Sequence, residues 1–239
     1  MSNFAVLDKN KHKNLRVAQG RGAEFGENVH LVPVIAEELN KLIIEYPVCL
    51  VKDNNTGQFG LQALLGFEPQ ENLFLCKNQW QANYLPLHIR RQPFMVAVNN
   101  KAGEQPSAEN TVITVNMNNT RVQEEEGELL FDESGNPTSY LNEINQLLST
   151  LVNGINQTQL FIHTISEYEL IEKVQVNVAF KSGEKKYFDG IYTINADKLK
   201  QLNAEQLIEL NQKGYLQACY LLLASIGNIQ KLINLKNNN

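Results

Sequence analysis

The chain has 239 residues, of which 43% are hydrophobic and 20% are charged, so it is long enough to bury a sizeable core in one large domain or two joined lobes. Its formal net charge is −5 and its basic residues are scattered, which argues against nucleic acid as a partner, because nucleic-acid binding usually needs a concentrated positive face. The three cysteines, Cys49, Cys76 and Cys219, lie far apart in apolar surroundings, which is typical of reduced thiols and points to the cytoplasm.

The beginning of the chain predicts short strands and one helix. Residues 1–27 are polar and glycine-rich, with Leu15–Val17 as the one expected strand, and Met1–Lys13 lacks the long apolar core of a secretory signal, so we expect no export by that route. Val29–Val34 predicts a strand entering a helix. Apolar residues at helical spacing then predict an amphipathic helix over Val34–Glu45, which Pro47 ends.

Strand signals dominate the next 70 residues. Val48–Val51 and Phe59–Leu65 flank an Asn- and Gly-containing turn and predict a hairpin. Further strands are expected over Leu73–Cys76, Phe94–Val98 and Thr111–Val115. The first half of the chain is therefore predicted to be β-rich with one helix.

An acidic segment, Gln123–Pro137, marks a sharp change in composition. It lacks the alternating Asp/Asn pattern of a calcium-binding loop, so it predicts a solvated acidic loop rather than a metal site. We interpret it as the connection between a β-rich lobe, residues 1–122, and a lobe of helices around a hairpin, residues 138–239. A single domain remains the alternative.

The second lobe is predicted from helical and alternating patterns. Two helices are expected, over Thr138–Leu151 and Thr158–Leu170, with Thr158 as the N-cap of the second. Lys173–Phe180 and Tyr187–Ile194 predict a second hairpin.

The chain is then expected to end in helices. Asn203–Gly214 predicts a capped helix, and a helical segment is expected over Tyr215–Leu235. The most apolar run, Ala218–Ile226, is shorter than the roughly 20 residues that span a bilayer, so we expect a buried helix and no membrane span. The predicted fold class is α+β: a β-rich N-terminal part with one amphipathic helix, and C-terminal helices around a β-hairpin, sharing one core.

One dense motif is the candidate ligand-binding site. It runs from Trp80, the only tryptophan, to Phe94. The candidate residues are Trp80, Tyr84, His88, Arg90 and Arg91. Tyr84 and His88 share a face in a helix or a strand, where they would offer a phenol and an imidazole that titrates near neutrality, beside a guanidinium suited to a carboxylate or phosphate. The alternative is a structural crossover in which the aromatic rings pack and the arginines bind loop carbonyls.

Other chemistry has no complete motif in the sequence. There is no Gly-x-Ser-x-Gly, no Gly-Lys-Ser/Thr and no close pairing of His or Cys, and Gly20, Gly22 and Gly26 form only a partial glycine pattern. We therefore expect no metal and no cofactor, and assign no catalytic residue.

A series of short motifs occurs in a fixed order along most of the chain. They are Leu15-Arg16-Val17, Glu45-Tyr46-Pro47, Leu64-Leu65-Gly66, Glu71-Asn72-Leu73-Phe74, Trp80-x-x-x-Tyr84-x-Pro86-x-x-x-Arg90-Arg91-x-Pro93-Phe94, Leu130-Phe131-Asp132-x-x-Gly135, Asp189-Gly190-Ile191-Tyr192 and Gly214-Tyr215-Leu216. In this order they resemble the bacterial SapC-like proteins, a family named after a gene associated with surface-layer proteins.

The resemblance implies a bacterial protein with no established activity. Its members are often encoded near flavin-dependent halogenases, cupin-like oxygenase relatives and outer-membrane TonB-dependent receptors. Two hypotheses follow. The favoured one is a noncatalytic binding or accessory protein of a nutrient-uptake or surface-associated pathway, which recognises an anionic small molecule, a peptide or a partner protein. The alternative is an enzyme or enzyme accessory that acts beside those halogenases or oxygenases through a Tyr84, His88 and arginine group.

Overall fold

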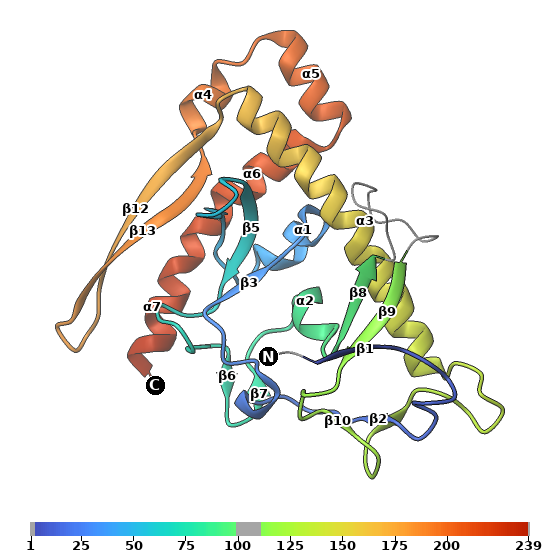
Figure 1. Ribbon diagram of the computed structural model, residues 1–239. Helices are drawn as coiled ribbons and strands as arrows, with labels where there is room; N and C mark the ends of the chain where they lie inside the picture. The colour runs from blue at the N-terminus through green and yellow to red at the C-terminus, as the bar shows by residue number, and fades with distance from the viewer. Residues whose placement is uncertain (1–2, 99–110, 239) are drawn as a thin grey trace. The chain divides into compact units, whose positions relative to one another are not determined.

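The structure is a computed structural model that describes residues 3–98 and 111–238 (Figure 1). Its described residues form two compact units, each assembled from several segments of chain. The first unit contains residues 1–28, 75–81 and 87–153, and the second contains residues 29–74, 82–86 and 154–239. The division into lobes at residues 123–137, and the single shared core, stay predictions.

Short antiparallel sheets build the first unit. One sheet has the order β1-β9-β8, a second has the order β10-β2-β11, and β6 and β7 form a hairpin. Their bounds are β1 Phe4–Val6, β2 Arg16–Val17, β6 Leu75–Cys76, β7 Gln79–Trp80, β8 Phe94–Val98, β9 Thr111–Asn116, β10 Val122–Gln123 and β11 Glu128–Leu129. The expected strands at 94–98 and 111–115 are confirmed, whereas β1 and the two strands that flank the acidic turn lay in segments predicted as loop. The unit also contains η1 (Ala23–Phe25) and α2 (Leu87–Arg90).

The first unit has an apolar core under the start of a long helix, α3 (Ser139–Glu167). Leu141, Ile144 and Leu148 recur at helical spacing on one face of α3 and pack against the strands. The other buried members of this cluster are Leu15, Val17, Phe94, Val115, Leu130 and Phe131. Side chains from segments more than 100 residues apart therefore hold this unit together.

The second unit contains a five-stranded antiparallel sheet with the order β12-β13-β4-β5-β3. Its strands are β3 Leu31–Pro33, β4 Val48–Lys52, β5 Phe59–Leu64, β12 Ile171–Ala179 and β13 Lys185–Ile194. Both predicted hairpins, β4–β5 and β12–β13, are confirmed. Because β13 pairs with β4 only at Ile191 and Tyr192, the distal half of the β12–β13 hairpin extends beyond β4 (Figure 1).

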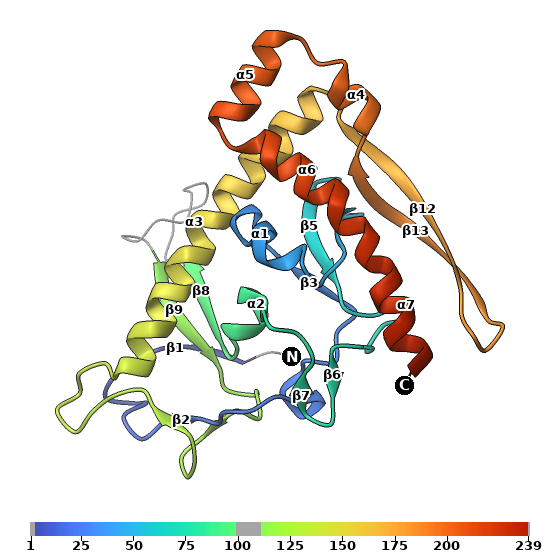
Figure 2. The ribbon, with the colours of Figure 1, turned by 180° about the vertical axis from the view of Figure 1, so that it is seen from behind.

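Helices accompany this sheet. They are η2 Ala36–Glu38, α1 Leu39–Leu42, α4 Ala196–Lys200, α5 Ala204–Gln212, α6 Tyr215–Ser225, η3 Ile226–Asn228 and α7 Ile229–Asn238. The predicted cap of α5 is confirmed, since the Asn203 side chain accepts a hydrogen bond from Gln206 N and the Asn203 backbone N–H donates to Gln206 Oε1. α6 and α7 run along the sheet (Figure 2).

Ser225 of α6 connects the helix to strand β4 of the sheet by hydrogen bonds. Its side chain is fully buried, and its Oγ both donates to Val48 O at 2.9 Å and accepts from Val48 N at 3.2 Å. Replacing Ser225 with alanine leaves both backbone groups of Val48 without this partner, so we expect the free energy of unfolding to fall by about 1–3 kcal/mol. Chemical denaturation measures this loss. The exposed Ala224→Ser is the matched control and should change stability by less than about 0.5 kcal/mol.

The helical segment Tyr215–Asn238 is long and apolar enough to cross a membrane by length and composition alone. Its inward face is buried, with Cys219, Leu222 and Leu232 at 1% exposure or less, whereas Tyr220 on the opposite face is 55% exposed. The expected buried helix is thus buried on one face only. The expectation that this segment does not span a membrane stays a prediction.

Two helix predictions were wrong. The helix expected over Val34–Glu45 is limited to η2 and α1, residues 36–42, and is followed by turns. The two helices expected over Thr138–Leu151 and Thr158–Leu170 are one helix, α3. Gly154 does not break α3 but permits close packing, because a Cβ there would lie 2.3 Å from Ile35 Cδ1. Thr158 is not an N-cap: its Oγ1 donates to Gly154 O and accepts from Ala36 N.

Candidate functional site

The structure divides the Trp80–Phe94 motif between the two units. Trp80 in β7, together with His88, Arg90 and Arg91 in and just after α2, belongs to the first unit, whereas Tyr84 belongs to the second. α2 brings His88 and Arg91 onto one face because they are three residues apart in a helical turn. The sharing of a face by Tyr84 and His88 stays a prediction.

Tyr84 is held by the helical turns of the second unit. Its hydroxyl donates to Glu38 Oε1 at 2.9 Å, and its carbonyl oxygen accepts a hydrogen bond from the hydroxyl of Tyr46. Glu38 is only 2% exposed, and its other oxygen accepts from Ile35 N at 3.1 Å. The Lys41 ammonium lies over the Tyr84 ring, 5.3 Å from its centre. These contacts give Tyr84 a structural role in anchoring residues 82–86.

His88 and Arg91 form a half-buried pair. Arg91 donates from Nε to His88 Nδ1 at 3.4 Å and from Nη1 to Phe94 O at 2.6 Å. Burial, assisted by the Arg91 charge, lowers the pKa of His88 to about 4. The imidazole is therefore neutral at pH 7, with Nδ1 as an acceptor and the proton on Nε2. The low pKa of His88 differs from the expectation that it titrates near neutrality.

The Arg91 guanidinium has no carboxylate beside it among the residues that the structure describes. Burial lowers the pKa of Arg91 without removing its charge, and within the described part of the chain it forms no ion pair. The neighbouring Gln92 has a buried Oε1 that accepts no hydrogen bond from the described residues. Two neighbours in the chain, Arg91 and Gln92, thus carry a hydrogen-bond donor and a hydrogen-bond acceptor that the described residues leave without a partner. Arg90 is exposed, and Trp80 is half-buried.

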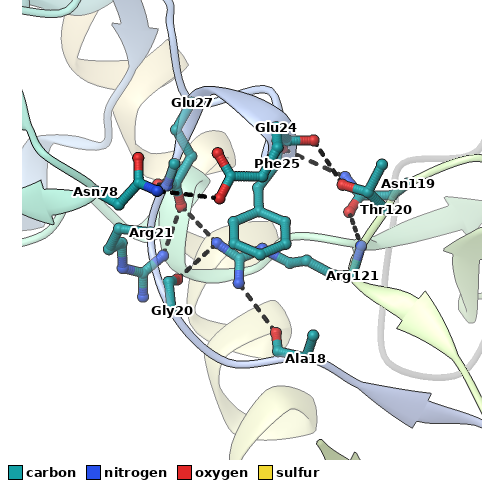
Figure 3. A network of polar contacts seen from close by, with 11 residues as sticks. Ala18, Gly20, Arg21, Glu24, Phe25, Glu27, Asn78, Asn119, Thr120 and Arg121 are labelled. Atoms are coloured by element: carbon teal, nitrogen blue, oxygen red, sulfur yellow. Dashed lines mark hydrogen bonds and ion pairs between the residues drawn. The ribbon is translucent and has the colours of Figure 1, made fainter. Parts of the chain in front are cut away.

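A second polar cluster joins three segments of the first unit around Arg121 and Glu27 (Figure 3). Glu27 is 0% exposed and Arg121 is 3% exposed. Glu27 Oε1 accepts from Arg121 Nη2 at 2.8 Å and from Arg21 Nη1 at 2.7 Å, and Glu27 Oε2 accepts from Gly22 N at 3.0 Å. A buried carboxylate is therefore satisfied by two guanidinium groups and a backbone amide.

Arg121 makes further contacts within this cluster. It donates from Nη1 to Ala18 O at 3.0 Å and from Nη2 to Gly20 O at 2.9 Å, and its guanidinium lies 3.9 Å from the centre of the Phe25 ring (Figure 3). Only its Nε lacks a hydrogen-bond partner among the described residues. Protein groups occupy the other nitrogens of Arg121. The cluster is therefore suited to hold the loop that contains Gly20, Gly22 and Gly26 rather than to bind a ligand.

Sequence reasoning missed the Arg21–Glu27–Arg121 cluster. The partial glycine pattern at Gly20, Gly22 and Gly26 was its one local signal, since Gly20 and Gly26 have positive φ angles of 114° and 79°. The partner of Glu27 lies 94 residues further along the chain. The position of that partner, Arg121, beside Glu27 follows only from the fold.

Two of the cysteines are buried, protonated thiols, and the described acidic groups form no metal-binding cluster. Burial raises the pKa of Cys49 and of Cys219 to about 12, so both thiols stay protonated. No group of three or more His, Cys, Asp or Glu side chains there could hold a metal ion. Glu124, Glu125 and Glu126 are exposed, as expected for a solvated acidic loop.

The architecture defines a mixed α+β protein of two units, with a half-buried His88–Arg91 pair at the central motif for which the described residues supply no carboxylate. The model of the SapC family matches residues 7–232, which is nearly the whole chain. The chain therefore belongs to the SapC family. No curated protein and no solved structure matches it.

Proposed function

We propose that this SapC-family protein is a noncatalytic binding or accessory protein of a bacterial nutrient-uptake or surface-associated pathway, and that it recognises an anionic small molecule, peptide or partner protein through the Trp80–Phe94 motif. The pathway rests on the family resemblance alone. The cytoplasm is the proposed location, supported by the free thiols of Cys49, Cys76 and Cys219.

The half-buried Arg91 is the single observation that carries the proposal. Removing a guanidinium from water costs free energy, and protein carboxylates usually offset that cost. Within the described residues Arg91 has only the neutral acceptors His88 Nδ1 and Phe94 O, so its positive charge is not compensated. A carboxylate or phosphate that accepted from its remaining nitrogen, Nη2, would supply the missing charge.

An Arg91→Lys variant tests the proposal. Lysine keeps the charge but loses the planar fork, so we expect the affinity for an anion bound by the motif to fall about tenfold or more, whereas the melting temperature without ligand changes by a few degrees at most. The probes are succinate, inorganic phosphate and an aspartate-containing peptide, followed by thermal shift and calorimetry.

Arg90→Lys is the matched control, because Arg90 is the exposed neighbour of the same residue type. It should bind the probes nearly as the parent chain does. If Arg91→Lys lowers the melting temperature as strongly as it lowers affinity, or if none of the anions binds the parent chain, Arg91 belongs to the scaffold and the proposal fails.

A further inference from the structure

Strand β1 lies at the end of the sheet β1-β9-β8 (Figure 1), so no strand of the described residues pairs with its outer edge. Free sheet edges are templates for pairing with another chain, and proteins often protect them with charged side chains, proline or a bulge. β1 has none of these, because it consists of Phe4, Ala5 and Val6 in unbroken register with β9. Phe4 is 42% exposed and Val6 is 57% exposed. The edge is therefore apolar and accessible.

The hydrogen bonds beside β1 show which of its backbone groups point outward. Leu7 N donates to Ile113 O at 2.9 Å, so Leu7 is a hydrogen-bonded position of the pairing with β9. Such positions alternate along an antiparallel strand, so the N–H and C=O groups of Phe4 and Val6 point away from β9. No hydrogen bond from the described residues reaches these groups.

The free edge is confined to β1. The next outward N–H along the chain, that of Asp8, donates to His12 Nδ1 at 3.0 Å and is therefore already used. What remains free is the outward N–H and C=O of two residues that are two positions apart, Phe4 and Val6.

This edge is complementary to a second copy of itself. When two β1 strands pair antiparallel about a two-fold axis at Ala5, Phe4 of each copy lies opposite Val6 of the other. Both are outward positions, so every outward N–H on one edge meets an outward C=O on the other. The strand has no charged side chain, so the pairing opposes no like charges.

The pairing also covers exposed apolar side chains. Val6, Thr114 and Met95 lie opposite one another and form one row on the outer face of the sheet. Phe4 of the second copy extends this row beside Val6. On the other face, Ala5 packs against the core of the first unit, and its small side chain leaves room for its own copy at the axis.

We infer that β1 is the contact of a symmetric dimer, in which the edges of two copies join their three-stranded sheets into one continuous sheet. Stable protein interfaces bury about 1,200–2,000 Å². Two strands of three residues bury less than this, so the dimer is weak, with an expected dissociation constant on the order of 0.1 mM.

Sedimentation velocity of the full chain between about 5 and about 500 µM measures the dimer. Val6→Lys places an ammonium at the edge and should raise the dissociation constant about tenfold or more, with little change in melting temperature because Val6 is exposed. Ile44→Lys is the matched control, the same kind of change at an apolar residue that is 71% exposed outside the sheet. It should leave the dissociation constant unchanged.

Val6→Pro tests the backbone hydrogen bonds. Proline removes only an N–H that points away from β9, so the strand keeps its bonds within the chain while the dimer is weakened about tenfold or more. Val6→Thr is the control, because threonine is also β-branched but keeps this N–H. It should dimerise nearly as the parent chain does.

A cysteine at Ala5 tests the register. Opposed residues of a non-hydrogen-bonded antiparallel pair have Cα atoms about 4.5 Å apart, which a disulfide can bridge. Ala5→Cys should therefore form a covalent dimer under mild oxidation with diamide. Asn10→Cys, exposed beyond the strand, should do so much more slowly, and the parent chain controls for Cys49, Cys76 and Cys219.

A chain that stays monomeric up to about 500 µM overturns the inference. So does a dimer that Val6→Lys and Ile44→Lys weaken equally. A dimer that is lost in Met95→Lys but kept in Val6→Pro would place the contact on the face of the sheet instead of its edge, and this also overturns the inference. Arg91 is not part of β1, so the inference and the proposed function can fail independently.

Discussion

Replacing Glu27 with glutamine is expected to lower the free energy of unfolding by about 3–5 kcal/mol. Glu27 is completely buried, and its carboxylate lies between the guanidinium groups of Arg21 and Arg121. Glutamine has nearly the same shape but no charge, and its amide N–H group cannot accept from a guanidinium. The substitution therefore leaves the 3% exposed Arg121 without its counter-ion.

Urea denaturation of the full chain measures this loss. The matched control is Glu24→Gln, the same change in an exposed residue three positions away, which should cost less than about 0.5 kcal/mol. A double-mutant cycle with Arg121→Gln separates the pair from its surroundings: the double variant should be more stable than the sum of the two single losses implies, because both charges disappear together. Equal losses for Glu27→Gln and Glu24→Gln would show that the buried pair does not stabilise the fold.

The second large effect is a loss of stability in acid caused by His88. Its pKa is about 4 in the folded chain, against an ordinary value of 6.5 for an unfolded histidine. Between these values the unfolded chain binds more protons, so stability rises with pH. The stabilisation by neutral His88 is complete above about pH 6.5 and is lost as the pH falls to about 4, and it amounts to about 3 kcal/mol.

A His88→Asn variant isolates this contribution. The asparagine oxygen can still accept from Arg91 Nε, but it does not titrate over this range. Between pH 7 and pH 4 the parent chain should lose about 3 kcal/mol more stability than His88→Asn does. His163→Asn is the control, because the His163 side chain is 69% exposed, and its pH profile should follow that of the parent chain. Parallel pH profiles for His88→Asn and the parent chain would mean that His88 is not held neutral by its surroundings.

Local patterns predicted the elements that depend on local interactions. The alternation of Lys173–Phe180 and Tyr187–Ile194 predicted β12 and β13, and the Asn203–Gly214 pattern predicted the capped helix α5. These elements form where side chains a few residues apart determine the backbone. The α+β fold class followed from such patterns and is confirmed.

Features that depend on tertiary contacts could not be predicted. Thr158 suggested the start of a second helix, yet α3 continues through it, with Gly154 packed against Ile35 and Thr158 bonded to Ala36. Likewise, the low pKa of His88 arises from its burial and from Arg91, which the spacing of the motif did not reveal. The motif is dense in the sequence, but the environments of its side chains had to come from the structure.

The discontinuous layout of the two units has a consequence for fragments of the protein. The chain passes from one unit to the other after residues 28, 74, 81, 86 and 153, and the last passage lies inside the continuous helix α3. A single cut between residues 29 and 153 therefore separates parts of both units from each other. Fragments cut in this range should expose apolar surface and aggregate, whereas the 239-residue chain should give stable protein.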